Sequence, residues 1–511
     1  MPATVPPGVP VTFAGSTQPV SAGPGARVIM AIGSARKGPD VPMRLSADQI
    51  GQYYGSFNET ASLSHTLPGL VYFASGQQPP TGAAAVDFLM CRAGVTRGTY
   101  AVVDTNSTPR TCFTLAGIGV YAGTASANLG FTYTAGPPAQ ITIVDNSTGA
   151  ILGVFTDGVN ADLSTNQKVV TAINGVNLTN NISSYVTAQM GSLSATAPAP
   201  VAAGGTQFTG GADGKGVAWG SATIGTNGSG GLLDQSIDFP VNFVVAGFDA
   251  AVCAPALLAH VGASGAASAD HDSFRECVLG PALGTPLSAL TGGYTTPFQS
   301  SRFACDAHDA WMALHPAKGY VDMVDGFYHA AASAGMKAAA PFYETCAGRN
   351  FFFNLFTDIG LPNGGTGPAL SPTDRNNLAG AGLFVSTKDK NTGGIRIREF
   401  VTTTPKMNPQ TNQVNVFYQL NRQDQDDTVA TVVTAALQDF LESPSFLPQA
   451  QATLMENAVR DALASLGSGI NGVNLVSFTY SISQNQLSGV VSYIGRDGVG
   501  SVPITVQSTE S

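Results

Sequence analysis

The chain has 511 residues, which is too long for one hydrophobic core and indicates about two to four domains. Apolar residues make up 43% of it and charged residues only 11%, whereas about 25% charged is usual in soluble proteins, so the composition favours a surface covered by partners in an assembly. The formal net charge is −10 and no run of Lys or Arg occurs, which argues against direct nucleic-acid binding.

Residues 1–26 are rich in Pro and Gly and predict an N-terminal arm that holds one strand. The strand is expected around Val9, Val11 and Phe13, and Gly23 and Gly25 follow it as a flexible tether. The segment has neither the basic start nor the apolar core of a signal peptide, so we expect synthesis and retention in a cytoplasm.

Residues 27–112 predict the first part of an α/β domain. A buried strand is expected at 28–32, a helix at 47–54 capped by Ser46, a second helix at 60–74 and a strand at 85–92.

Residues 113–235 change to a composition of Gly, Thr, Ser and Asn and predict an inserted β-rich outer domain. Strands at 141–144 and 151–155, joined by a turn at 146–149, form a hairpin pattern. A helix at 164–174, closed by Gly175, interrupts the strands.

Residues 236–390 predict the return of the same α/β domain. The apolar run at 243–261 contains Asp249 and favours a buried strand, 243–246, leading into a helix rather than a membrane span. Further along the chain we expect helices at 270–279, 301–314 and 326–334, with a strand at 319–324.

Residues 391–496 predict a C-terminal α+β domain, and residues 497–511 a C-terminal arm. The expected elements of the α+β domain are strands at 395–403 and 414–420, amphipathic helices at 426–441 and 447–466, and strands at 475–481 and 487–494. Gly495, Gly498 and Gly500 then tether a last strand at 502–507. A lone strand must find hydrogen-bond partners, and a tether permits pairing with a neighbouring subunit. Val502, Ile504 and Val506 are the expected exchange residues.

The sequence predicts no catalytic, cofactor-binding or metal site. The densest group of titratable residues comprises His308, Asp309, His315, Asp322, Asp325 and His329. In a helix, His308 and His315 would share one face and could serve as two metal ligands, but scattered surface groups with one packing histidine are favoured. A hydrolase would require a converging nucleophile, base and oxyanion donors, and the sequence indicates no such set.

Four short motifs, in this order, resemble the contractile tail sheath family of myophages and related injection systems. They are PGV at 7–9, VIMAIGSARKGP at 28–39, FTGGADG at 208–214 and RIREFVTTT at 396–404. The resemblance implies a virion protein assembled in the bacterial cytoplasm, without cofactor or membrane insertion. Its subunits would form six-fold rings around a tail tube, and its arms would donate strands to neighbours. Its partners would be further copies, the tube protein, the baseplate and the tail terminator, and contraction would drive genome delivery.

Contraction requires two packings of the same domains, and the expected hinges are the two glycine tethers. The acidic start of the C-terminal helix, with Asp424, Asp426 and Asp427, is the candidate contact with the tube. A surface-layer or adhesin-like β-rich protein is the main alternative, because it would also explain the low charge.

Six cysteines occur without C-x-x-C spacing, at 91, 112, 253, 277, 305 and 346, so burial as small apolar residues is their ordinary interpretation. We nevertheless predict at least one disulfide in the mature particle, formed by oxidation after lysis, within or between subunits. Cys277, Cys305 and Cys346 stand beside charged residues and are expected to be accessible. Cys112 and Cys253 are further candidates, and Cys91 is expected in the core.

Overall fold

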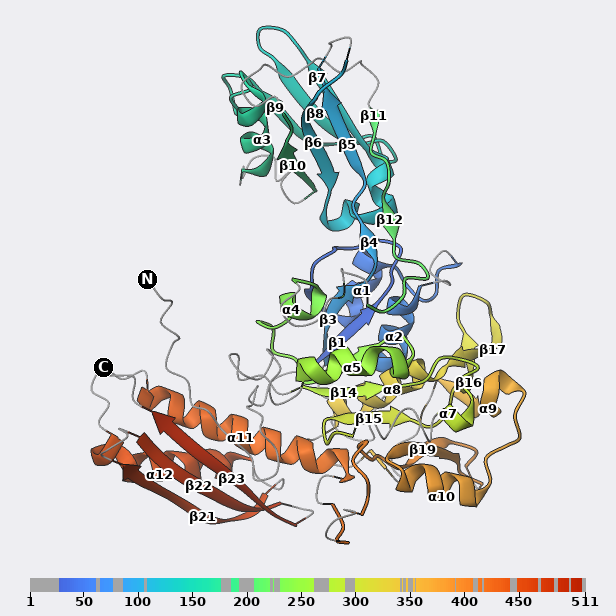
Figure 1. Ribbon diagram of the computed structural model, residues 1–511, viewed down its shortest axis with the longest axis vertical. Helices are drawn as coiled ribbons and strands as arrows, with labels where there is room; N and C mark the ends of the chain where they lie inside the picture. Colours follow the sequence, from blue (N-terminus) through green and yellow to red (C-terminus); the bar gives the residue numbers. More distant parts are fainter. Residues whose placement is uncertain are drawn as a thin grey trace. The chain divides into compact units, whose positions relative to one another are not determined.

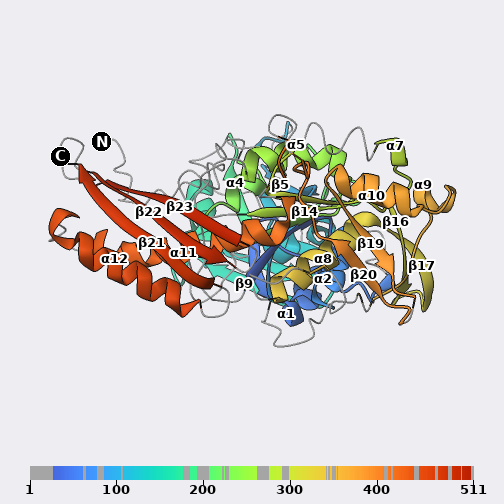
Figure 2. The ribbon, with the colours of Figure 1, turned by 90° about the horizontal axis from the view of Figure 1, so that it is seen from below.

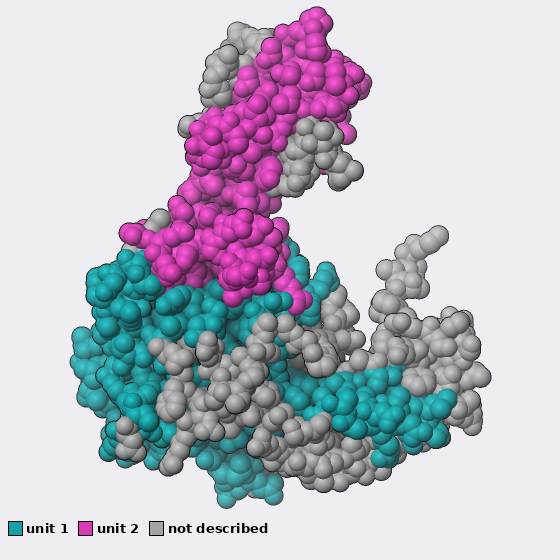
Figure 3. Space-filling view, turned by 180° about the vertical axis from the view of Figure 1, so that it is seen from behind, with its two compact units in different colours: residues 1–31, 70–89, 225–511 teal, residues 32–69, 90–224 magenta. Residues whose placement is uncertain are grey.

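The structure is a computed structural model, and it describes the residues 27–60, 65–76, 86–104, 108–175, 185–192, 206–220, 224, 230–261, 275–289, 299–340, 342, 346–347, 353, 355–390, 392–407, 412–415, 418–441, 448–466, 470–481, 486–495 and 498–507. The chain is a mixed α/β protein with several sheets (Figure 1). It divides into two compact units, coloured separately in Figure 3: residues 1–31, 70–89 and 225–511, and residues 32–69 and 90–224.

The largest sheet has eight strands, in the order β2 (Met43–Ser46), β3 (Val86–Arg92), β1 (Arg27–Gly33), β13 (Phe243–Ala246), β14 (Glu276–Leu279), β15 (Phe303–Asp306), β19 (Leu383–Lys388) and β20 (Ile395–Glu399). The strands from β13 to β19 are parallel, and β20 is antiparallel to β19. Every residue of β13, β14 and β15 is buried. This continuous burial is typical of parallel strands covered on both faces.

Helices cover this sheet on both sides. Figure 2 shows α5 (Ala250–Val261) and α8 (Gly326–Ala339) on opposite sides of β14, and α10 (Pro372–Gly380) contacts β19. Every residue of α8 is buried, and Gly335 permits its close approach to another backbone, since a Cβ there would lie 2.0 Å from the carbonyl oxygen of Ala74. The other described helices outside the β-rich and C-terminal regions are α1 (Ala47–Tyr54), α2 (Thr66–Ser75), α4 (Leu232–Gln235), α7 (Leu287–Ala289) and α9 (Pro362–Gly365).

Several predicted elements are confirmed, and the prediction of two helices is wrong. The capped helix at 47–54, the strand at 243–246 and the helix beginning at 326 are present. Residues 276–279 instead form strand β14, and the stretch 301–314 contains β15 and most of β16 (Ala310–His315). Both stretches are short and carry charged residues, yet Arg275, Glu276 and Arg302 are buried with these strands.

A smaller sheet, β17-β16-β18, combines β16 with β17 (Tyr320–Asp325) and β18 (Phe356–Ile359). Both pairings are antiparallel, and the strand predicted at 319–324 corresponds to β17. Within the described part of the chain, no helix is both long and apolar enough to cross a membrane.

The second unit contains a β-rich region with its own core. Its sheets have the orders β10-β6-β5, β11-β7-β8-β9 and β12-β4. Phe113, Phe131 and Phe155 are fully buried there, and α3 (Asn166–Asn174) supplies Val169 and Ile173 to the same core. The other elements are β4 (Val95–Thr96), β5 (Thr99–Val103), β6 (Thr111–Gly117), η2 (Gly119–Tyr121), η3 (Gly123–Asn128), β7 (Leu129–Thr134), β8 (Gln140–Asp145), β9 (Ala150–Thr156), β10 (Val186–Met190), β11 (Thr206–Gln207) and β12 (Ala212–Asp213).

The hairpin predicted in this region is confirmed, because β8 and β9 pair antiparallel. The β-rich region begins before residue 113, however, since β5 pairs along β6 and Val102 belongs to the same core.

The C-terminal region consists of α11 (Leu420–Leu441), α12 (Pro448–Ser465), β21 (Ile470–Ser481), β22 (Gln486–Gly495) and β23 (Gly498–Gln507). The two helices contact each other, and both lie on the same side of the three strands (Figure 2). The two predicted helices and the last three predicted strands are therefore present. The strand predicted at 414–420 is wrong: among the described residues there, Val414 and Gln419 form only isolated bridges, and α11 begins at 420.

Candidate functional site

The three C-terminal strands form an antiparallel meander with two outer edges. β22 lies in the centre and pairs with β21 and β23. Among the described strands, β21 and β23 each have one strand neighbour. An edge strand presents N–H and C=O groups to which a further strand can be added. Pro503 in β23 has no N–H donor, which suits a strand at a sheet edge. The sheet can therefore accept strands of another chain by main-chain pairing.

The predicted exchange residues of the C-terminus lie in β23. Val502, Ile504 and Val506 are opposite Val491, Gly489 and Leu487 of the same chain. Gly495 pairs with Gly498 at the closed end of this hairpin, so the predicted tether at 495–500 is instead largely strand in the single chain. Gly500 is likewise in β23. The predicted N-terminal residues Val9, Val11, Phe13, Gly23 and Gly25 lie outside the described residues.

The acidic start of α11 is buried, which corrects its prediction as a contact for the tube. Asp424, Asp426 and Asp427 are 8%, 3% and 8% exposed. Asp426 lies 3.3 Å from Arg422 one turn earlier on the helix. These carboxylates interact with cations of their own chain and have little surface to offer a partner.

Asp424 joins α11 to two other elements. Its Oδ2 lies 2.9 Å from Arg27 Nη1 at the start of β1 and 2.6 Å from Lys337 Nζ on α8. Burial opposes ionisation of Asp424, but the two cations hold its pKa below the ordinary value. Asp424 is therefore an ionised carboxylate shared by two cations.

Asp427 makes a second connection. Arg302, directly before β15, donates Nη1 and Nη2 to the two oxygens of Asp427, over 2.6 and 2.8 Å. Gln423 Nε2 donates to the same carboxylate over 2.8 Å. Burial raises the pKa of Asp427, and Arg302 opposes that rise. The bidentate geometry fixes the position of the helix against the sheet.

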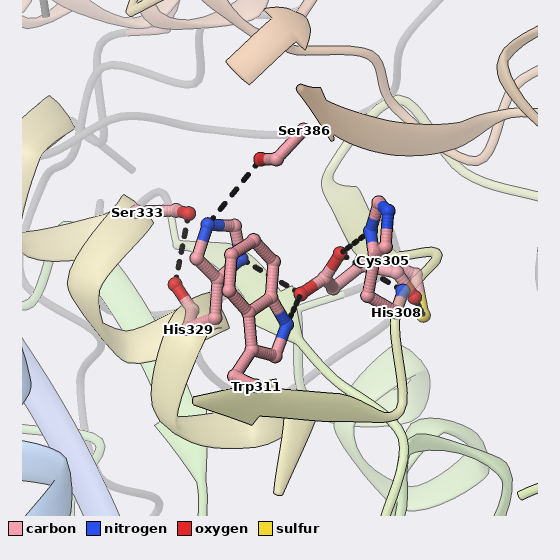
Figure 4. Close-up of polar contacts among 7 residues, drawn as sticks. Cys305, His308, Trp311, His329, Ser333 and Ser386 are labelled. Atoms are coloured by element: carbon pink, nitrogen blue, oxygen red, sulfur yellow. Dashed lines mark hydrogen bonds and ion pairs between the residues drawn. The ribbon is translucent and has the colours of Figure 1, made fainter. Parts of the chain in front are cut away.

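A second buried polar cluster has the connectivity of a Ser-His-Asp triad (Figure 4). Ser386 Oγ on β19 lies 3.3 Å from His329 Nε2 on α8, and His329 Nδ1 lies 2.7 Å from Asp306 Oδ2 at the end of β15. Trp311 donates its indole N–H to Asp306 Oδ2 over 3.0 Å, and its ring stacks on His329 at 3.6 Å between centroids.

This cluster is built for packing rather than for hydrolysis. Ser386, His329 and Asp306 are completely buried, so a substrate has no access to the hydroxyl group in this structure. Burial lowers the pKa of His329, which favours a neutral ring. Burial disfavours an ionised Asp306, yet the His329 ring and hydrogen bonds from His308 hold its pKa below the ordinary value. The carboxylate thus joins α8, β15 and β16 through satisfied hydrogen bonds.

The histidines considered as metal ligands do not lie on a helix. His308 precedes β16 and bonds Asp306, whereas His315 is the last residue of β16 and His329 is on α8. In the described part of the chain, no group of three or more His, Cys, Asp or Glu residues could hold a metal ion.

Comparison with known proteins identifies the fold. No protein-family model and no curated protein matches the sequence. A solved structure of a sheath tail protein from Desulfitobacterium hafniense is similar over 95% of this chain and 97% of its own, with 13% identity and a TM-score of 0.54. A sheath tail protein from Listeria innocua is similar over 96% of this chain and 97% of its own, with 12% identity and a TM-score of 0.58. The chain has the sheath tail protein fold.

The cysteines of this sheath-fold chain are buried and free, which contradicts the predicted accessibility of three of them. All six lie among the described residues and none is in a disulfide. Cys277, Cys305 and Cys346, expected to be accessible, are at most 3% exposed. Burial raises the pKa of Cys277 and of Cys305, which keeps both thiols protonated and unreactive. Glu276 beside Cys277 and Asp306 beside Cys305 are themselves buried.

Sequence reasoning missed the residues that hold both polar clusters together in the sheath fold. Arg302, Lys337 and Glu276 meet the start of α11 from separate elements, and Ser386 meets His329 across 57 positions of the sequence. One signal was available: Lys337 stands alone in the small-residue stretch 330–340, and Arg275 and Glu276 directly precede an apolar run. A charge inside an apolar run indicates a buried partner.

Proposed function

We propose that this chain is the structural subunit of a phage contractile tail sheath. It polymerises as six-fold rings around a tail tube and contracts to drive the tube through the host envelope. The observation that carries the proposal is the sheath tail protein fold over at least 95% of the chain. The low content of charged residues, 11%, supports a surface that partners cover. The chain acts by assembly and not as an enzyme.

Strand exchange is the proposed means of polymerisation. The N-terminal arm, with Val9, Val11 and Phe13, adds a strand to an edge of the C-terminal sheet of a neighbour. β23 moves from its own β22 to a neighbouring sheet when residues 495–498 open. An exchanged strand makes the same main-chain hydrogen bonds as the strand it replaces, so the exchange costs little free energy and links many subunits at once. The glycines at both tethers then allow the globular domains to move during contraction.

The partners follow from this role. They are further copies of the chain, the tail tube protein, the baseplate and the tail terminator. The site of action is the virion tail, which is assembled in the host cytoplasm. The tube-facing surface lies outside Asp424, Asp426 and Asp427, because these carboxylates are engaged within the subunit.

Electron microscopy of the purified protein at increasing concentration tests the proposal. The full chain should form tubes, whereas variants that lack residues 1–22 or 500–511 should remain folded, soluble and unassembled. A variant that lacks residues 508–511 is the matched control, because β23 ends at Gln507 and stays whole. Long sheaths from either longer truncation would contradict strand exchange. Flat lattices from the full chain would favour a surface-layer protein.

A further inference from the structure

Glu276 is a buried carboxyl group without a hydrogen bond. It lies on β14, where it is 3% exposed, and neither Oε1 nor Oε2 has a hydrogen-bond partner among the described residues. An ionised carboxylate in such a place is strongly unfavourable, because burial removes its hydration without replacing it. The Glu276 carboxyl group must therefore be protonated, or it must become exposed to water.

The charged groups around Glu276 come from three other elements. Asp424 and Asp427 face it from α11, Lys337 faces it from α8, and Arg302 faces it from the start of β15. Both cations are committed elsewhere: Lys337 to Asp424 and the carbonyl of Phe342, and Arg302 to Asp427. Burial and the two aspartates raise the pKa of Glu276 well above its ordinary value, although the two cations oppose the rise.

The same aspartates dock the first turns of α11 on the α/β part of the chain. Asp424 binds Arg27 and Lys337, and Asp427 binds Arg302. If α11 moved away, Glu276 would lose the two neighbouring negative charges of Asp424 and Asp427. Docking of α11 and ionisation of Glu276 therefore oppose each other.

We propose that Glu276 makes the docking of α11 dependent on protons, so that one proton is taken up at this carboxyl when the helix docks and released when the helix moves away. This linkage is a property of the single subunit and is independent of polymerisation.

The sign of the effect follows from proton binding. Well below the ordinary Glu pKa of about 4.5, the carboxyl is protonated in both states and does not affect docking. Above that value the undocked form ionises while the docked form keeps its proton, so docking weakens as the pH rises. A single linked proton changes the docking equilibrium by up to about tenfold per pH unit until the docked carboxyl also ionises.

Amide hydrogen exchange of the full-length unassembled subunit, measured by mass spectrometry between pH 5.5 and 8.5, tests this inference. Exchange rates are corrected for the intrinsic effect of pH, and peptides from residues 420–427 are compared with the fully buried α8 as an internal reference. Protection of 420–427 should fall by tenfold or more across the range while that of α8 stays constant. In Glu276→Gln the protection of 420–427 should stay at the acid level throughout.

Glu59→Gln is the matched control, because Glu59 is exposed and pairs with Arg36 at the surface. It should keep the wild-type pH dependence. Constant protection of 420–427 in the wild type, or the same pH dependence in wild type and Glu276→Gln, would overturn the proposal. If Glu276→Gln does not fold, Glu276→Met provides a second neutral side chain, and the wild-type profile alone remains decisive.

Discussion

Replacement of Arg302 by Met should destabilise the subunit strongly, because it leaves Asp427 buried and without its cation. Arg302 and Asp427 form two parallel hydrogen bonds of 2.6 and 2.8 Å, and both residues are buried. Loss of one partner of a buried ion pair typically costs about 3–5 kcal/mol, most of it from the uncompensated charge. Arg110→Met is the matched control, because Arg110 is 54% exposed in its pair with Asp104 and should contribute about 0–1 kcal/mol.

Urea unfolding in a Trp219→Phe background measures this cost. The chain has two tryptophans, and the remaining Trp311 is fully buried in the same unit as Arg302, so its fluorescence reports on that unit. The double variant Arg302→Met/Asp427→Leu should regain most of the lost stability, since it removes both charges. A cost for Arg302→Met no greater than that of Arg110→Met, or no recovery in the double variant, would refute the account of this ion pair.

Three further predictions concern buried groups. His260 Nε2 lies 2.7 Å from Arg275 Nη1, and burial together with this cation lowers the pKa of His260 to about 3. In the unfolded chain the same histidine takes up a proton below about pH 6.5, whereas in the folded state it does not. Unfolding free energy should therefore fall between pH 7 and 5 more steeply in the wild type than in His260→Gln, and parallel losses would contradict this. The six cysteines should react with iodoacetamide only after denaturation, as mass spectrometry of the native and unfolded protein will show, and rapid labelling of the native subunit would be inconsistent with their burial. A fluorophosphonate should leave Ser386 unlabelled, because its hydroxyl is fully buried, whereas a covalent adduct would reveal a reactive serine.

Local patterns in the sequence predicted the elements whose signals are local. Ser46 has the capping residue Gln49 three positions later, and the helix at 47–54 begins there. The alternation at 141–144 and 151–155 predicted the hairpin of β8 and β9 for the same reason. Both patterns need only neighbouring residues to take effect.

The polar clusters could not be predicted in this way, since their partners are distant in the sequence. Arg27 meets Asp424 across 397 positions, and Arg302 meets Asp427 across 125. Without these partners, charged residues indicate an exposed surface, and this is why the start of α11 was predicted as a contact for the tube. Tertiary pairing overrides the usual relation between charge and exposure.

A helical reconstruction of tubes assembled from the purified chain tests the central claim most directly. The account predicts rings with six-fold symmetry in which a strand from one chain pairs with the C-terminal sheet of the next. Rings of another symmetry, or subunits that contact one another without any shared strand while β23 stays on its own β22, would contradict it.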